Sequence, residues 1–282
     1  MSAQKSGLRL MLIASVAALS LAACNREREK AAPDAAPAGA GAVVTPADAA
    51  APFGYESKTP YASVTLTLPS ALKAQPDLHA ALYAETVRDL RQFVEGAQAD
   101  RTEAGAEPGM PPYEKTIELK AAGETAKLFS LERVDYDFTG GAHGNSLFAG
   151  VLWDKALKRR ITAAELFRKG ADSRALDQAL CAAINAAKKG RDPAAQPVAL
   201  GGSDWACPRA LATPFVLTPG TTGGKAGGLT FLIGPYQVGP YAEGPYEVVV
   251  PQTAFRSLIA AAYADEFGGA PIKTGDATPQ PG

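Results

Sequence analysis

The sequence predicts an α+β fold of two small subdomains, with mainly antiparallel sheet and packed helices. Apolar residues alternate along several short segments, as in half-buried strands, and recur every three or four residues along others, as in amphipathic helices. Strand and helix patterns follow one another irregularly, without the regular alternation of a doubly wound parallel sheet. Hydrophobic residues make up 46% of the 282-residue chain, a content that excludes a wholly disordered protein.

The first subdomain is predicted at residues 55–154. An apolar stripe predicts a helix over 78–94, and a polar loop with Gly and Pro follows over 99–112. Within the strand expected at residues 125–138, the apolar residues change from odd to even positions, which predicts a β-bulge near Glu132 or Arg133. The strands are expected at residues 61–68, 113–120, 125–138 and 147–153, with a hairpin partner at 158–161 just beyond the boundary.

The second subdomain is predicted at residues 155–265. A helical pattern runs from Leu176 to Ile184, and Gly190 is expected to end that helix. Pro251 suits the first turn of a final helix. The apolar face of the final helix would be Phe255, Leu258, Ile259 and Ala262. The other elements are a short helix at 163–167 and strands at 214–217, 229–233 and 246–250.

Residues 1–23 have the features of a secretory signal: positive charge, then an apolar stretch too short to anchor stably, then small residues. The run Leu21-Ala22-Ala23-Cys24 resembles the lipobox of bacterial lipoproteins, whose cysteine is acylated and becomes the mature N-terminus. We therefore expect acyl chains on Cys24 to hold the protein to a membrane. Asn25 favours the outer membrane, with the protein facing the periplasm. The alternative is an ordinary signal peptide cut nearby.

Two segments are poor in large apolar side chains. Residues 24–54 are rich in Ala, Pro, Gly and Asp, and residues 266–282 have a similar composition. Such segments bury too little apolar surface to offset the entropy lost on ordering. We expect the first to be a disordered tether and the second a disordered tail.

The cysteines support an exported location. Besides Cys24, the chain has Cys181 and Cys207, an even pair that predicts a disulfide in an oxidising compartment. Two free thiols are the alternative. The histidines, His79 and His143, lack metal-ligand spacing, so no metal or cofactor is expected. A formal net charge of −1 and the lack of a basic face argue against a nucleic-acid partner.

The loop at residues 139–145 is rich in glycine. Gly140, Gly141 and Gly144 permit positive φ and close backbone approach, so amide groups could converge on an oxyanion or a sugar. His143 would then act as a donor or base. The alternative is a tight connection between two strands, in which His143 caps backbone groups.

A second feature is a five-residue repeat of Gly-Pro-Tyr between residues 234 and 246. Its tyrosines, Tyr236, Tyr241 and Tyr246, could form a platform on which sugar rings or a partner's side chains stack. The alternative is a bulged hairpin whose tyrosines pack over the sheet edge and whose prolines block edge pairing.

Two clusters of motifs together resemble the RsiV-like family. They lie at residues 136–145 and 229–251, with the segment 164–167 between them. That family pairs two small domains of unknown function, which occur in a lysozyme-sensing anti-sigma factor, beside the catalytic domain of a peptidoglycan deacetylase and in bacterial lipoproteins. The resemblance implies an exported two-domain module of the cell envelope. The sequence contains neither that catalytic domain nor a sigma-binding segment, so neither activity is expected.

These observations predict a lipid-anchored, non-catalytic module that binds peptidoglycan, another envelope glycan or an envelope protein. The alternative is a hydrolase of envelope polymers in which His143 acts as acid or base beside Asp137 or Glu243. The candidate ligand-binding residues are Gly140, Gly141, His143, Gly144, Tyr236, Tyr241, Glu243 and Tyr246.

Overall fold

The structure is a computed structural model that describes residues 51–105 and 111–279. The expected signal peptide, Cys24 and most of the expected tether lie outside the described residues. Within the described ranges, no helix combines the length and the hydropathy needed to cross a membrane.

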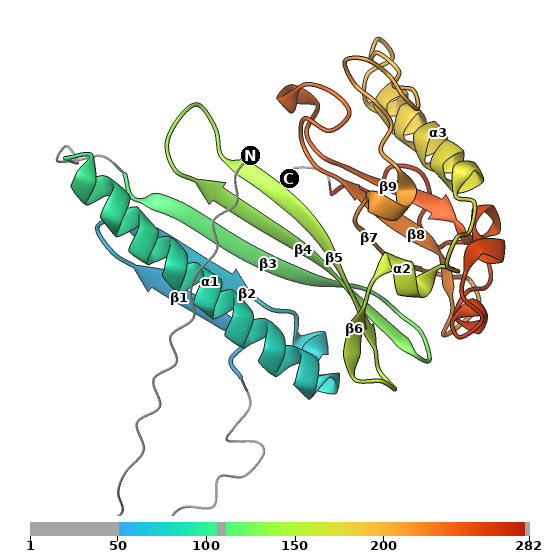
Figure 1. The fold of residues 1–282 in the computed structure, drawn as a ribbon, viewed down its shortest axis with the longest axis horizontal. Helices are drawn as coiled ribbons and strands as arrows, with labels where there is room; N and C mark the ends of the chain where they lie inside the picture. Colours follow the sequence, from blue (N-terminus) through green and yellow to red (C-terminus); the bar gives the residue numbers. More distant parts are fainter. Residues whose placement is uncertain (1–50, 106–110, 280–282) are drawn as a thin grey trace, which may run out of the picture. The chain divides into compact units, whose positions relative to one another are not determined.

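The α+β fold is confirmed: the described residues form two sheets with three α-helices (Figure 1). The first sheet has six strands, which pair in sequence order. All neighbours are antiparallel except β2 and β3, which are parallel because the long helix α1 (Pro76–Glu103) crosses between them. The strands are β1 (Gly54–Lys58), β2 (Ala62–Thr67), β3 (Tyr113–Glu124), β4 (Leu128–Phe138), β5 (Asn145–Asp154) and β6 (Arg159–Ile161).

Helix α1 lies across one face of this sheet (Figure 1). The centre of its predicted apolar stripe, Leu78, Leu82 and Leu90, is buried, and the rest of the stripe is buried or half-buried. Val64 and Leu66 of β2 belong to the same core. The helix continues nine residues beyond Val94, so the predicted loop at 99–112 begins too early. Arg101, in the last turn, is buried and donates to the carbonyl oxygen of Pro111, which explains why a polar sequence stays helical there.

The predicted bulge in β4 is wrong. Glu132 and Arg133 pair in regular register with β3, and the register shift lies in β3 between Ala121 and Gly123. The apolar positions of β4 change phase for another reason. Residues 128–131 are buried on both faces of the sheet, so odd-numbered and even-numbered residues are both shielded from water there.

The second sheet has three antiparallel strands in the order β7 (Phe215–Pro219), β8 (Ala226–Ile233) and β9 (Tyr246–Pro251), and each overlaps a predicted strand. Helix α3 (Arg174–Arg191) packs on β9, and the short α2 (Ala163–Leu166) joins the same core (Figure 1). Gly190 does not end α3, which continues to Arg191. The predicted disulfide between Cys181 and Cys207 is confirmed, and it links α3 to the segment before β7.

The predicted final helix is wrong, and its predicted apolar face is buried only in part, because Leu258 is half-buried and Ala262 is exposed. Phe255 and Ile259 are 0% and 3% exposed, but the segment forms two short 3-10 turns, Gln252–Ala254 and Arg256–Leu258. Ile259 instead forms an isolated antiparallel bridge with Phe167. This backbone pairing requires an extended conformation, which ends the helical path.

The expected disordered tail is also corrected, because residues 266–279 pack against the second sheet. The amide of Gly268 donates to Ala226 O at 2.9 Å, and the amide of Ala277 donates to Glu247 O at 2.7 Å. These hydrogen bonds join backbone groups, which are present whatever the amino-acid composition of the segment. A segment with few apolar side chains can therefore be ordered by pairing with sheet edges.

The two sheets meet where β7 lies against β3, β4 and β5. A Cβ at Gly150 would lie 1.9 Å from the carbonyl oxygen of Phe215, so only glycine permits this approach. The amide of Leu217 donates to Ser130 Oγ at 3.0 Å. The buried carboxylate of Glu266 accepts from Thr125 Oγ1 at 2.6 Å and from the amide of Lys127. The subdomains therefore share a packed, hydrogen-bonded junction.

Candidate functional site

The glycine-rich loop connects β4 to β5, and its glycines are required by geometry. Gly140 and Gly141 have φ values of +104° and +93°, which confirms the conformation that the sequence analysis proposed for this loop. A Cβ at Gly144 would lie 2.3 Å from the ring of Tyr136. This backbone path brings His143 towards the Gly-Pro-Tyr segment of the second subdomain.

The imidazole of His143 has a defined set of partners. Its Nδ1 lies 2.9 Å from Gly144 O, so Nδ1 carries a proton and donates to this carbonyl. Its Nε2 lies 3.3 Å from Tyr236 Oη, and in the neutral ring the phenol donates to this nitrogen. The ring stacks on Tyr241, with centroids 3.8 Å apart and planes 14° apart.

His143, Tyr236 and Tyr241, which we call the aromatic cluster, join the two subdomains. Tyr241 Oη donates to Gly144 O at 3.1 Å, and the two tyrosine rings have centroids 5.4 Å apart. Tyr236 is 51% exposed and has a φ of +67°, an uncommon value for a residue other than glycine. Strained backbone at an exposed aromatic residue points to a functional surface.

Glu243 and Tyr246, two predicted ligand residues, are hydrogen-bonded to each other next to the aromatic cluster, and Glu243 is also bonded to Lys188. Glu243 Oε2 accepts from Lys188 Nζ at 2.6 Å and from Tyr246 Oη at 2.9 Å. Tyr246 is only 1% exposed, so it cannot form part of a binding platform. Burial, followed by the hydrogen bond to Glu243, raises the pKa of Tyr246 to about 12, so its hydroxyl remains a donor. Two of the three repeat tyrosines are therefore accessible.

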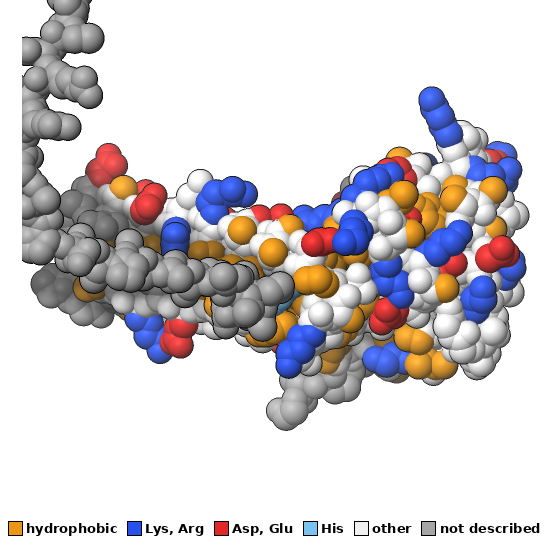
Figure 2. Space-filling view, turned by 90° about the horizontal axis from the view of Figure 1, so that it is seen from below, with side chains coloured by type: hydrophobic (Ala, Val, Ile, Leu, Met, Phe, Trp, Pro, Cys, Tyr) orange, Lys and Arg blue, Asp and Glu red, His pale blue; other side chains and the backbone are white. Residues whose placement is uncertain are grey.

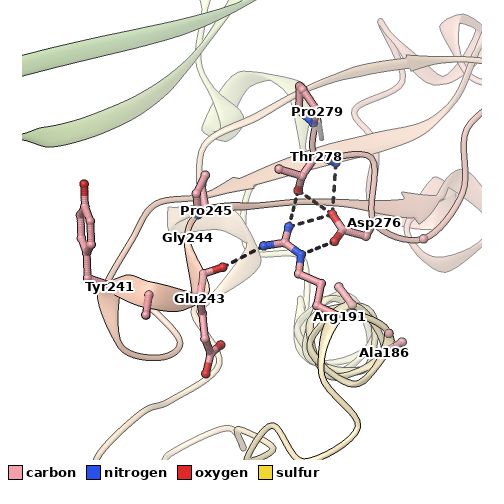
Figure 3. A pocket seen from close by; sticks show the side chains of 13 residues that line it. Ala186, Arg191, Tyr241, Glu243, Gly244, Pro245, Asp276, Thr278 and Pro279 are labelled. Carbon is pink, nitrogen blue, oxygen red and sulfur yellow. Dashed lines mark hydrogen bonds and ion pairs between the residues drawn. The ribbon is translucent and has the colours of Figure 1, made fainter. Parts of the chain in front are cut away.

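A groove of about 1220 Å³ begins at Tyr241 and runs between α3 and the C-terminal segment (Figure 3). Arg191 lies on its wall, where its Nε is 2.6 Å from Asp276 Oδ2 and its Nη1 donates to Glu243 O at 2.9 Å. Burial tends to raise the pKa of Asp276, but the bonds from Arg191 and Thr278 outweigh it and hold this pKa below its usual value.

His143 has no carboxylate partner in the part of the chain that the structure describes. Among the described residues, the hydrogen-bond partners of its ring nitrogens are Gly144 O and Tyr236 Oη. Glu243 is engaged by Lys188 and Tyr246, and Asp137 makes no hydrogen bond to the imidazole. The same residues contain no group of three His, Cys, Asp or Glu side chains that could hold a metal ion.

Two protein-family models match consecutive parts of the chain. Residues 55–146 match the family described as deacetylase PdaC, and residues 164–253 match the protein of unknown function family DUF3298. The chain is a tandem of the two domains paired in the RsiV-like family. Its aromatic cluster takes His143 from the first matched range and Tyr236 and Tyr241 from the second.

Two solved structures are similar to the chain. A DUF3298 family protein from Pseudomonas aeruginosa PAO1 is 18% identical, with a TM-score of 0.52, over 77% of this chain and 94% of that one. A DUF3298 family member from Bacteroides fragilis NCTC 9343 is 18% identical, with a TM-score of 0.49, over 76% and 95% of the chains. At this identity the former supports the fold alone. Among curated proteins, no match was found.

Sequence reasoning missed a pair of carboxylates, Glu132 on β4 and Glu247 on β9. Burial raises the pKa of both. For Glu247, repulsion from Glu132 adds to burial, whereas Lys273 and Lys120 oppose it, and the pKa reaches about 7. The available signal was a single glutamate in the otherwise apolar strand that begins at Tyr246.

We expect replacement of Glu247 by Gln to stabilise the protein at alkaline pH. Because the pKa of Glu247 is raised from 4.5 to about 7, the folded state holds its proton more tightly than the unfolded state, and the protein loses stability as pH rises from about 4.5 to about 7. Allowing for solvent screening, the variant should be about 1 kcal/mol more stable than the parent at pH 8. Urea unfolding at pH 4.5 and 8 tests this.

The control is Glu95→Gln, at an exposed position of α1. Equal stability of Glu247→Gln and the parent at pH 8 would contradict the account of this carboxylate pair.

Proposed function

We propose that this protein is a lipid-anchored module of the bacterial cell envelope that binds an envelope glycan or protein without chemical turnover. The aromatic cluster carries the proposal. Tyr236 is exposed and held in a strained conformation, and Tyr241 links it to an adjoining groove. Aromatic faces that are fixed in place before binding are suited to stack on sugar rings or on a partner's side chains.

The surroundings of the cluster favour binding over hydrolysis. A general base needs a partner that orients it, and a hydrolase also needs a nucleophile or an activated water. Within the described residues, His143 makes hydrogen bonds with a carbonyl and a phenol and stacks on Tyr241, and these contacts hold its ring in place. On the face shown in Figure 2, basic and acidic side chains are interspersed, which gives no support for a polyanionic nucleic-acid ligand.

Membrane attachment depends on Cys24 in this proposal. We expect Cys24→Ser to abolish incorporation of a labelled fatty acid and to leave unprocessed precursor or a released soluble form, because the thiol is the acyl acceptor. Metabolic labelling followed by membrane fractionation measures both effects. Ser20→Ala, in the apolar stretch before the lipobox-like run, is the control and should be labelled like the parent. Labelling of the Cys24→Ser protein would contradict this proposal.

Binding can be tested with purified, insoluble peptidoglycan and a chain released from the membrane by Cys24→Ser. We expect the protein to sediment with peptidoglycan and to release no soluble fragments. Tyr236→Ala should weaken this binding about tenfold or more, as removal of a central aromatic contact does at other interfaces. Tyr55→Ala, on the distant edge strand β1, is the matched control.

Unchanged binding by Tyr236→Ala would contradict the proposed role of the aromatic cluster. Release of fragments by the parent and not by His143→Ala would favour the hydrolase alternative. If peptidoglycan is not bound, a photo-crosslinker at position 236 should capture an envelope protein, and failure of both assays would overturn the proposal.

A further inference from the structure

The outer edge of β9 is covered by residues 275–278 of the same chain. The sheet order β7-β8-β9 makes β9 an edge strand. Its Val249 amide donates to Gly275 O at 3.0 Å, and the amide of Ala277 donates to Glu247 O at 2.7 Å. Val248 and Asp276 form an antiparallel bridge. The segment therefore pairs with β9 as a short added strand, which hides backbone groups that an edge would otherwise present.

This segment is attached by polar contacts and not by a buried apolar side chain. None of residues 271–279 is buried, and the one large apolar side chain there, Ile272, is 60% exposed. Gly275, at the start of the pairing, has a φ of +69°. Segments that bury little apolar surface open at a low free energy compared with the core. Residues 275–278 can thus leave β9 without disrupting either hydrophobic core.

Arg191 is a charged side chain beside the outer edge of β9 that binds residues 276 and 278. The guanidinium of Arg191 binds Asp276 through Nε at 2.6 Å and Thr278 Oγ1 through Nη2 at 2.6 Å (Figure 3). The guanidinium also lies over the ring of Tyr246, 3.8 Å from its centroid, which fixes its position. Lys189 stands in the same last turn of α3. The edge therefore combines strand pairing with a fixed cationic group for a carboxylate.

We infer that the outer edge of β9 is a docking site for an extended peptide of a partner protein that carries an acidic side chain, and that residues 275–278 occupy this site within the chain. An incoming peptide pairs with Val249 and Glu247, and its carboxylate takes the place of Asp276 on Arg191. Strand addition of this kind obtains affinity from backbone bonds and specificity from side-chain pockets. The inference does not rest on the proposed function, since no side chain of the aromatic cluster takes part.

The test uses the full chain and a synthetic peptide with the sequence of residues 272–279 as the probe. In the parent, the attached segment competes at a high effective concentration, so the peptide should bind poorly. Asp276→Ala combined with Thr278→Ala loosens the segment and should strengthen peptide binding about tenfold, measured by fluorescence anisotropy. A peptide with Ala in place of its Asp should lose this gain. Asp265→Ala, at an exposed residue outside this segment, is the control.

Amide hydrogen exchange provides a second readout on the same full chains. The double substitution should speed exchange at Val249 and Ala277 about tenfold and leave the amides of β8 unchanged, and the added peptide should slow exchange at Val249 again. Exchange at Val249 that is as slow in the variant as in the parent would overturn the inference. A folded variant that binds the peptide no better than the parent would overturn it as well.

Discussion

Lys188→Met should destabilise the protein by about 3 kcal/mol, because it breaks a buried ion pair and leaves one charge behind. Lys188 is 2% exposed, and its Nζ donates to Val238 O and to Glu243 Oε2, both at 2.6 Å. Methionine fills the same space but cannot pair with the carboxylate. Both acceptors belong to the Gly-Pro-Tyr segment, so the loss also loosens the part of the chain that holds Tyr241.

Urea unfolding measures this loss, and Lys189→Met is the matched control at an exposed neighbour. The control should change the free energy of unfolding by less than about 0.5 kcal/mol. Adding Glu243→Gln to Lys188→Met should restore part of the stability, because it removes the charge left without a partner. A Lys188→Met protein as stable as the parent would show that this pair does not support the segment.

Gly150→Ala should destabilise the protein by about 2–3 kcal/mol, although it adds only one methyl group. The new Cβ would lie 1.9 Å from the carbonyl oxygen of Phe215, so β7 and β5 must separate. Because the subdomains share this junction, we expect one cooperative unfolding transition, shifted as a whole.

Thermal unfolding, followed by circular dichroism, checks both the shift and the single transition. Gly223→Ala is the control, since a Cβ there would have no atom within 4 Å. If Gly150→Ala unfolds like Gly223→Ala, the close contact between the sheets is not present in solution.

The sequence predicted best the elements whose period is tied to one buried face. Val64, Leu66 and Leu68 alternate and are all buried, and the helical spacing from Leu176 to Ile184 matches the buried face of α3. In these segments local pattern and tertiary packing agree, so the pattern alone was sufficient. The disulfide was predicted from the even number of cysteines other than Cys24, together with the expectation of export.

Other elements depended on partners distant in the sequence. The segment after Pro251 has helical spacing, but it forms two short 3-10 turns and then becomes extended at Ile259, which pairs with Phe167. Residues 266–279 were assigned to a flexible tail because they have few large apolar residues, yet hydrogen bonds to the second sheet fix their backbone. Composition reports side-chain burial and carries no information about such backbone pairing.

The candidate site was predicted in part. The positive φ of Gly141 and the gathering of tyrosines followed from residue types, and His143 does meet Tyr236 and Tyr241. The burial of Tyr246 away from this surface could not be predicted, because each Gly-Pro turn changes the direction of the chain and therefore the side on which the next side chain lies. The contacts of His143 with residues about a hundred positions away left no signal in a single sequence.

A double-mutant cycle between His143 and Tyr241 tests most directly the claim that loops of both subdomains form one surface. The rings stack with centroids 3.8 Å apart, so the free energies of unfolding of His143→Ala, Tyr241→Ala and the double variant should reveal a coupling of about 0.5–1.5 kcal/mol. A parallel cycle between His143 and Tyr55 should be additive within about 0.3 kcal/mol. Additivity of the His143 and Tyr241 substitutions would contradict the account.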